Sequence, residues 1–150
     1  MNIPQKSSFD WRLRIRTTKK ARYILVGFQT NKEGNQEQNA SLFDHCDLKN
    51  MWIELNEEIY PASLSFPNMK LTRAYRHAAN FAEVYYNMTN LISLCSITPS
   101  DYRDLYPFMY FNVSKQSERM KDSTVDIRLK AEFNTPVPAG TIIYALIISD

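Results

Sequence analysis

The sequence predicts an all-β sandwich that forms a single domain and carries one inserted α-helix. Several segments of strand length alternate apolar with polar residues or form short apolar runs, and turn signals separate them. One stretch in the middle instead repeats its apolar side chains at helical spacing. The length of 150 residues suits one domain, and the 44% of hydrophobic residues are enough to build a buried core.

The first half of the chain contains three predicted strands. Residues 9–16 alternate apolar with mostly charged side chains, which is the period of a strand that buries one face. Residues 22–28 form an almost unbroken β-branched and aromatic run, typical of a strand that is covered on both faces. After a long polar loop, residues 51–56 alternate again and predict a third strand.

The middle of the chain predicts the inserted helix, over about residues 68–88. Its apolar or aromatic side chains recur in steps of three and four, at Leu71, Tyr75, Ala78, Ala82 and Tyr85. Asn68 is the predicted N-cap of this helix. Further on, Thr98 followed by Pro99 predicts a short helical turn with a threonine cap and proline at its first position.

The chain then returns to strands. Residues 91–97 form a short apolar run, and residues 108–113 follow a proline that the start of a strand tolerates. Residues 125–133 alternate without a break and make the cleanest strand pattern in the chain. A turn that ends at Gly140 leads into residues 141–148, an apolar strand suited to the interior of a sandwich.

No linker or internal repeat divides the chain, so we expect one domain over residues 1–150, with residues 1–8 as a flexible N-terminal arm. We expect no membrane span, because no apolar run approaches the ~20 residues that a spanning helix needs. We also expect a protein that is not secreted, since no signal peptide is present. Cys46 and Cys95 lack paired spacing and are predicted to be free thiols.

Residues 44–47, Asp-His-Cys-Asp, are the one cluster with metal-ligating side chains. A metal site needs three or four converging ligands, whereas consecutive residues of a strand point to alternate faces. We therefore expect Asp44 and His45 to satisfy backbone groups where a loop joins a strand, with Cys46 packed as a small apolar residue. No nucleophile signature accompanies either cysteine, so we predict no metal, no cofactor and no catalysis.

The best candidate for binding is a stripe of arginines, Arg12, Arg14 and Arg16, which share the outward face of the first predicted strand. Their spacing of about 6.6–7 Å roughly matches successive phosphates, but the nearest aromatic residue, Trp11, falls on the opposite, core-facing side. We therefore favour a subunit contact or another anionic protein partner over nucleic acid. A simple solvated face stays open as the third interpretation.

Several of these segments, taken in order, resemble one family. They are the strand 22–30, the loop Phe43-Asp44-His45, the strand end from Leu55-Asn56 to Tyr60-Pro61, residues 123–128, and Ala139-Gly140-Thr141 with the final strand 144–148. Together they are similar to the C-terminal jelly roll of the double jelly-roll major capsid proteins. Large DNA viruses and adintovirus- or Polinton-like integrated elements of animal genomes carry such proteins.

The resemblance implies a jelly-roll β-sandwich and a structural role without catalytic residues. In that family two jelly rolls in one polypeptide stand upright, three copies form a capsomer, and capsomers tile a shell. We therefore expect a virion protein that assembles in the cytoplasm or nucleus of a host cell. Its expected partner is itself, as a homo-trimer, or a sister jelly-roll protein.

The chain departs from the family pattern in two ways. Its 150 residues are enough for one jelly roll only, and a first strand at Phe9 suggests that the opening strand of the roll is shortened or absent. A single roll should expose the apolar surface that packs on its sister. Two alternatives therefore remain: a repurposed host or viral protein-interaction module, and a sugar-binding or enzymatic jelly roll with a pocket of convergent polar groups.

Overall fold

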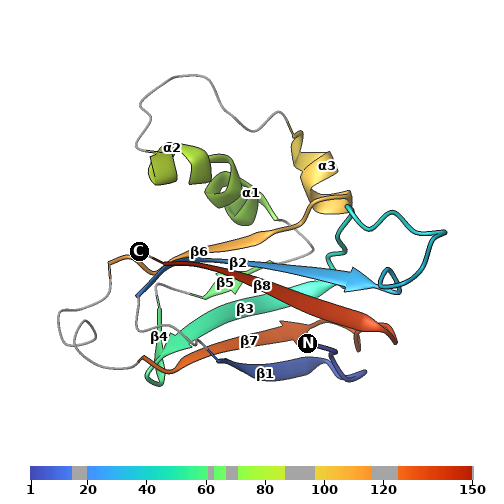
Figure 1. The fold of residues 1–150 in the computed structure, drawn as a ribbon, viewed down its shortest axis with the longest axis horizontal. Helices are drawn as coiled ribbons and strands as arrows, with labels where there is room; N and C mark the ends of the chain where they lie inside the picture. The colour runs from blue at the N-terminus through green and yellow to red at the C-terminus, as the bar shows by residue number, and fades with distance from the viewer. Residues whose placement is uncertain (15–19, 61–62, 67–70, 87–96, 116–124, 150) are drawn as a thin grey trace.

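The protein is described by a computed structural model over residues 1–14, 20–60, 63–66, 71–86, 97–115 and 125–149 (Figure 1). Two antiparallel sheets are stacked face to face, and helices lie on the outer side of one of them. The five-stranded sheet contains β1 (Ser8–Leu13), β7 (Ile127–Phe133), β3 (Leu48–Leu55), β4 (Glu58–Ile59) and β5 (Leu64–Ser65). The three-stranded sheet contains β6 (Met109–Asn112), β2 (Ala21–Thr30) and β8 (Thr141–Ser149).

The order of the strands is that of a jelly roll, in which eight consecutive strands are distributed over two sheets so that the second pairs with the seventh and the third with the eighth. In the five-stranded sheet the order is β1-β7-β3-β4, and β5 pairs with β3 nearer its start. The short strands β4 and β5 thus share the fifth position. In the three-stranded sheet the order β6-β2-β8 gives the sixth, third and eighth positions. The predicted jelly-roll sandwich is confirmed.

The first position of the jelly roll is occupied by only a few residues. Asn2 forms an isolated antiparallel bridge with Ile142 of β8, and the backbone N–H of Ile3 donates to the carbonyl of Thr141 at 2.9 Å. The side chain of Ile3 is buried in the core. In the structure these residues therefore dock on β8, whereas we expected residues 1–8 to form a flexible arm.

The core lies between the two sheets and follows the predicted alternation. Every second residue of β7 is buried, as are the corresponding residues of β3. Nearly all of β2 is buried, as expected for a strand that is covered on both faces. Three aromatic rings join the sheets near one end, where Phe28 packs edge-on against Phe9 and Phe133 at centroid distances of 6.4 and 5.5 Å.

The prediction of one continuous inserted helix over about residues 68–88 was wrong. The structure has α1 (Thr72–Ala79) and α2 (Phe81–Tyr86), which are separated at Asn80, and a third helix, α3 (Pro99–Asp104). Asparagine is a poor helix former, and the backbone N–H of Asn80 closes α1 by donating to Arg76 and Ala78. The predicted cap Asn68 lies outside the described residues.

The short helix α3 begins as the sequence predicted. Its N-cap Thr98 accepts a hydrogen bond from the backbone N–H of Asp101 at 3.2 Å, and Pro99 takes the first helical position. The other predicted strands are confirmed to within a few residues at their ends, except that residues 91–96 lie outside the described part of the chain. Residues 141–148, which we expected in the interior of the sandwich, form an edge strand with an exposed outer face instead. Among the helices that are described, none is both long enough and apolar enough to cross a membrane.

Candidate functional sites

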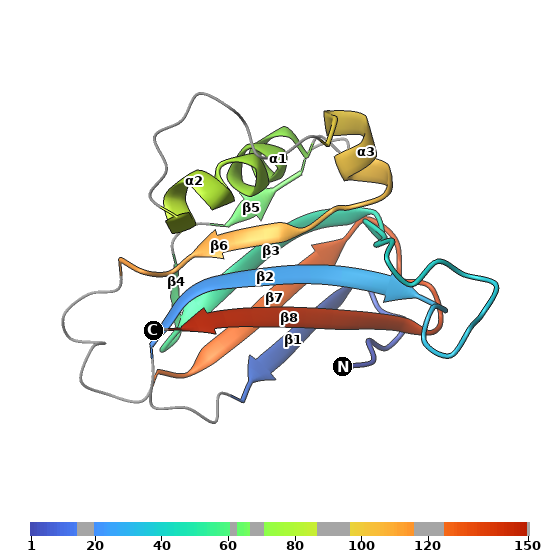
Figure 2. The same ribbon diagram turned by 45° about the horizontal axis from the view of Figure 1, so that its top comes forward.

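Strand β8 forms an edge of the three-stranded sheet and is paired along only part of that edge (Figure 2). At its start, the amino group of Met1 donates to the carbonyl of Ile143 at 3.0 Å, and the N–H of Ile143 returns a bond to Met1 at 2.9 Å. Beyond Ile143, no described residue pairs with the outer edge of the strand. We call residues 144–149 the open edge of β8.

The backbone groups of the open edge can be assigned from the alternation of an antiparallel ladder. Ile143 directs its N–H and C=O away from β2, so Ala145 and Ile147 direct theirs the same way. The backbone N–H and C=O groups of Tyr144 and Leu146 instead point toward β2, where these residues lie opposite Gly27 and Leu25. Unpaired backbone groups on an uncharged edge strand are a template for another strand.

The side chains of the open edge are also poorly covered. Tyr144 is 43% exposed and Leu146 is 60% exposed, although both are large and apolar. Both side chains lie on the outer face of the three-stranded sheet, because the alternate residues Ile143, Ala145 and Ile147 pack against the core between the sheets. The helices cover the other half of this face, where Phe81 of α2 packs on Tyr23 at 5.9 Å. The described helices therefore cover the half of the outer face over β6 and leave the half over β8 bare.

The arginine stripe is divided in the structure. Arg12 lies in β1 and forms an ion pair with Asp126 at 2.6 Å, while its side chain remains 66% exposed. Arg14 is exposed and follows the end of β1, and Arg16 lies outside the described residues. Whether these residues contact a subunit or an anionic partner stays a prediction, and Arg12 has an intramolecular partner.

Arg12 belongs to a network of charges over the outer face of the five-stranded sheet. Arg128 approaches Asp10 at 3.4 Å, and Lys130 forms an ion pair with Glu54 at 2.9 Å. The hydrogen bond from Lys130, with a second from Trp52, lowers the pKa of the Glu54 carboxyl below its usual value. This face is thus occupied by mutually paired charges, in contrast to the open edge of β8.

Residues 44–47 do what we expected of a loop-to-strand junction. Asp44 accepts a hydrogen bond from the backbone N–H of Thr30 at 2.9 Å, and it forms an ion pair with the buried Lys32 at 3.3 Å. The Nδ1 atom of His45 accepts a hydrogen bond from the N–H of Asp47 at 3.0 Å. Within the described part of the chain, no three histidine, cysteine, aspartate or glutamate side chains gather closely enough to hold a metal ion.

The thiol of Cys46 is held in its neutral form. Burial raises its pKa to about 11, in spite of a weak hydrogen bond with the Thr30 hydroxyl, which lies 3.9 Å from the sulfur. A nucleophilic cysteine needs a lowered pKa, so Cys46 packs as a small apolar residue instead. Cys95 lies outside the described residues.

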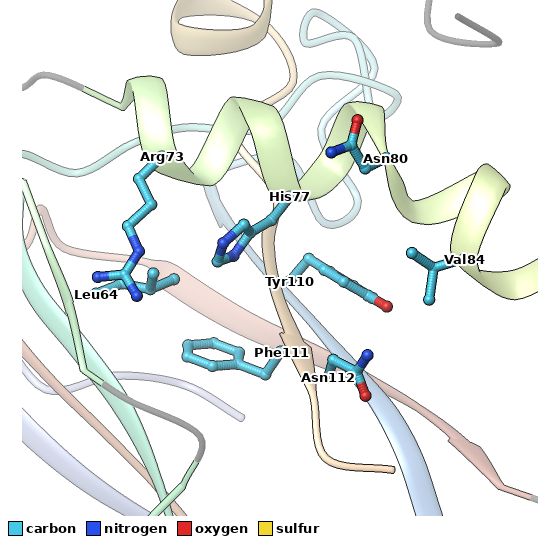
Figure 3. A pocket seen from close by; sticks show the side chains of 8 residues that line it. All are labelled: Leu64, Arg73, His77, Asn80, Val84, Tyr110, Phe111 and Asn112. Carbon is cyan, nitrogen blue, oxygen red and sulfur yellow. The ribbon is translucent and has the colours of Figure 1, made fainter. Parts of the chain in front are cut away.

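A pocket of about 250 Å³ lies between the helices and β6, and sequence reasoning missed it (Figure 3). Its lining combines Arg73, His77, Asn80 and Val84 of the helical segment with Leu64 and residues 110–112 of β5 and β6. The hydroxyl of Tyr110 is buried in it without a hydrogen-bond partner. Because these residues come from separate elements, no local pattern in the sequence indicates that they meet.

The ring of His77 is held toward its neutral form inside this pocket. Burial is the larger cause of its lowered pKa, and the charge of Arg73 adds to it, against a hydrogen bond to the backbone of Tyr110. The permanent positive charge of the pocket is therefore that of Arg73. Among the described residues that line it, none has an acidic side chain.

The strand order and the two-layer core define a protein of the jelly-roll class. A family model described as the double jelly roll-like domain matches residues 2–150. The chain belongs to that family, which confirms that its sequence resembles a double jelly-roll protein. Searches among curated proteins and among solved structures gave no match.

Proposed function

We propose that the protein is a capsid-like structural subunit that associates with itself or packs on a partner jelly roll in a viral shell, without catalysing a reaction. The open edge of β8 is the observation that carries this proposal. Membership of the double jelly roll-like family supports a structural role, and the edge supplies a surface that suits a second protein chain.

The free energy of association has two sources at this edge. The N–H and C=O groups of Ala145 and Ile147 can pair with an incoming strand, which also excludes water from them. Covering Leu146, which is 60% exposed, removes apolar surface from water at about 25 cal/mol for each Å². A stable contact normally buries about 1,200–2,000 Å² in total, so the open edge is the centre of a larger interface.

The arginine stripe is the proposed second contact. Its Arg12 lies in β1 of the five-stranded sheet, whereas the open edge belongs to β8 of the three-stranded sheet. Two different surfaces on one subunit permit an assembly larger than a pair, including the trimer and shell that we expect. In this proposal Arg12 or Arg14 contacts an acidic surface of a neighbouring copy. The protein is then located in the virion.

The alternative function is a repurposed interaction module on the same scaffold. It uses the open edge of β8 to bind one protein partner, and it forms a defined small oligomer without larger assembly. The exposed Tyr144 and Leu146 suit either function, because both need an apolar contact surface.

The test is the solution mass by light scattering of the wild type and of Ala145→Pro. Proline at 145 removes an N–H that points away from β2, so the sheet keeps its own hydrogen bonds while the edge loses a donor. The matched control is Ser8→Pro, because Ser8 starts β1 at the edge of the other sheet and directs its N–H away from β7.

We expect trimers or larger assemblies for the wild type and for Ser8→Pro, and a smaller species for Ala145→Pro that is still folded by circular dichroism. A defined small oligomer that does not grow with concentration favours the interaction module. A wild type that stays monomeric at all protein and salt concentrations contradicts both proposals.

A further inference from the structure

We propose that the pocket between α1, α2 and β6 binds a small carboxylic acid that carries a second acceptor oxygen, such as a ketone, at its far end. This site is separate from the open edge of β8, and the proposal does not depend on subunit assembly. It rests on the hydrogen-bonding groups of the pocket that have no partner.

The first of these groups is the hydroxyl of Tyr110. The residue is only 6% exposed, and its oxygen has no hydrogen-bond partner among the described residues. A buried polar group without a partner costs about 1–3 kcal/mol, so native proteins normally satisfy it. Figure 3 shows the hydroxyl directed into the pocket, beside Val84.

The side chain of Asn112 adds a second donor at the same end of the pocket. Its Oδ1 atom already accepts hydrogen bonds from the N–H and the hydroxyl of Ser114, at 3.1 and 2.6 Å. These bonds fix the orientation of the amide and leave its NH₂ group as the free end, which Figure 3 shows on the side of Tyr110. Two neighbouring donors suit an acceptor oxygen of a ligand.

The opposite end of the pocket is positively charged. Figure 3 shows the guanidinium of Arg73 beside Leu64, away from the Tyr110 hydroxyl. No described carboxylate forms an ion pair with Arg73, and none lines the pocket. A guanidinium binds a carboxylate through two parallel hydrogen bonds, which makes a carboxylate the matching group at this end.

The body of the ligand follows from the size and the remaining lining of the pocket. A volume of about 250 Å³ is slightly below the ~300–1,000 Å³ of drug-sized sites, so the ligand is small. Leu64, Val84 and Phe111 supply apolar contacts between the two polar ends. A short aliphatic chain with a carboxylate at one end and a carbonyl near the other meets all three requirements.

The experiment is an NMR titration of the full chain with three matched probes. Levulinate has both the carboxylate and the ketone, pentanoate lacks the ketone, and 2-pentanone lacks the carboxylate. We expect levulinate to bind most tightly and to shift the ring signals of His77, which lines the pocket between the two ends. Each missing polar group should weaken binding about tenfold.

Two variants assign the groups to the ends of the ligand. Tyr110→Phe should weaken levulinate but leave pentanoate unchanged, and Arg73→Gln should weaken both acids but leave 2-pentanone unchanged. The control is Arg76→Gln, because Arg76 is an exposed arginine of α1 that does not line the pocket.

The proposal is overturned if none of the probes shifts the signals of the lining residues. It is also overturned if Arg76→Gln weakens the acids as much as Arg73→Gln, since the acids would then bind only to the general positive charge of α1. The solution mass of the protein plays no part in these outcomes, so the capsid-like function stands or fails separately.

Discussion

The outer faces of the two sheets differ in how they meet the solvent. On the five-stranded sheet, alternate residues of β1, β3 and β7 are charged or polar and pair with one another across the strands. On the three-stranded sheet, the outward side chains include the aromatic Tyr23 and Tyr110 and the apolar Leu146, and the described helices cover them over β6 but not over β8. Both faces belong to the same jelly roll, so the difference reflects their surroundings and not the fold.

The comparison shows which face is suited to remain in water. A surface of mutually paired charges needs no partner, because each charged group has a neighbour of opposite sign or faces solvent. A bare apolar face next to unpaired backbone groups is an aggregation hazard unless another protein covers it. The sandwich therefore has one outer face of paired charges and another on which the described residues leave large apolar side chains exposed.

The largest expected effect compares two leucines that receive the same substitution. Leu129 of β7 is fully buried between the sheets, whereas Leu146 of β8 is 60% exposed. Leu129→Ala should lower the free energy of unfolding by about 2–5 kcal/mol, because it leaves a cavity. Leu146→Ala should change it little and should instead weaken association. Urea unfolding and light scattering of both variants test this, and a large loss of stability in Leu146→Ala contradicts the assignment of a bare face.

The next prediction tests how tightly the covered half of the three-stranded sheet is packed at Gly27. A Cβ atom at Gly27 would lie 2.7 Å from the ring of Phe43 and 3.2 Å from that of Phe108. Gly27→Ala should therefore destabilise the fold by about 1–3 kcal/mol through overpacking. Thermal unfolding measures the loss. An unchanged melting temperature would mean that Phe43 moves aside freely and that the cover is loose.

A smaller effect on stability is expected where charges are exposed. The double variant Arg12→Glu with Arg14→Glu removes the ion pair to Asp126, which at this exposure contributes about 0–1 kcal/mol. If the stripe contacts another subunit, the variant should also weaken association, and wild-type association should weaken with added salt. Sedimentation at two salt concentrations checks both, and an unchanged mass removes the stripe from the interface.

The smallest expected effect is a pH dependence of the paired face. Hydrogen bonds from Lys130 and Trp52 lower the pKa of Glu54 in the folded state below its unfolded-state value near 4.5. The stability that these bonds contribute is therefore present above pH 4.5, and it is lost as the pH falls through the folded-state pKa. The melting temperature of Glu54→Gln should therefore be lower than that of the wild type at pH 7, and the difference should shrink at pH 3. A difference that is constant over this range contradicts the pairing.

The strands were predictable because their patterns are local. The alternation in residues 125–133 and the apolar run in residues 22–28 depend only on which faces are buried, and each became a strand of the expected kind. The strands β4 and β5 were missed, since each has two residues and carries too short a pattern. The break at Asn80 was also missed, because the helical spacing continues across it.

The sites were less predictable, since tertiary structure creates them. The roles of Asp44 and His45 followed from their position between a loop and a strand. The open edge of β8 depends instead on which strands pair in the sheet, and the pocket depends on a contact between α1 and β6. The ion pair of Arg12 with Asp126 joins residues that are 114 positions apart, so no local pattern reveals it.

The pairing of strands that lie far apart in the sequence has a consequence for the order of events during synthesis. Met1 bonds to Ile143, 142 positions later, and β1 pairs with β7 near the other end of the chain. Neither sheet can close until the last strands have left the ribosome, so the apolar residues of β1 and β2 stay exposed while the rest of the chain is made. Such non-local pairing folds in milliseconds to seconds and not in microseconds. The nascent protein therefore passes through a long aggregation-prone stage, and its yield should depend on chaperones that hold exposed apolar strands.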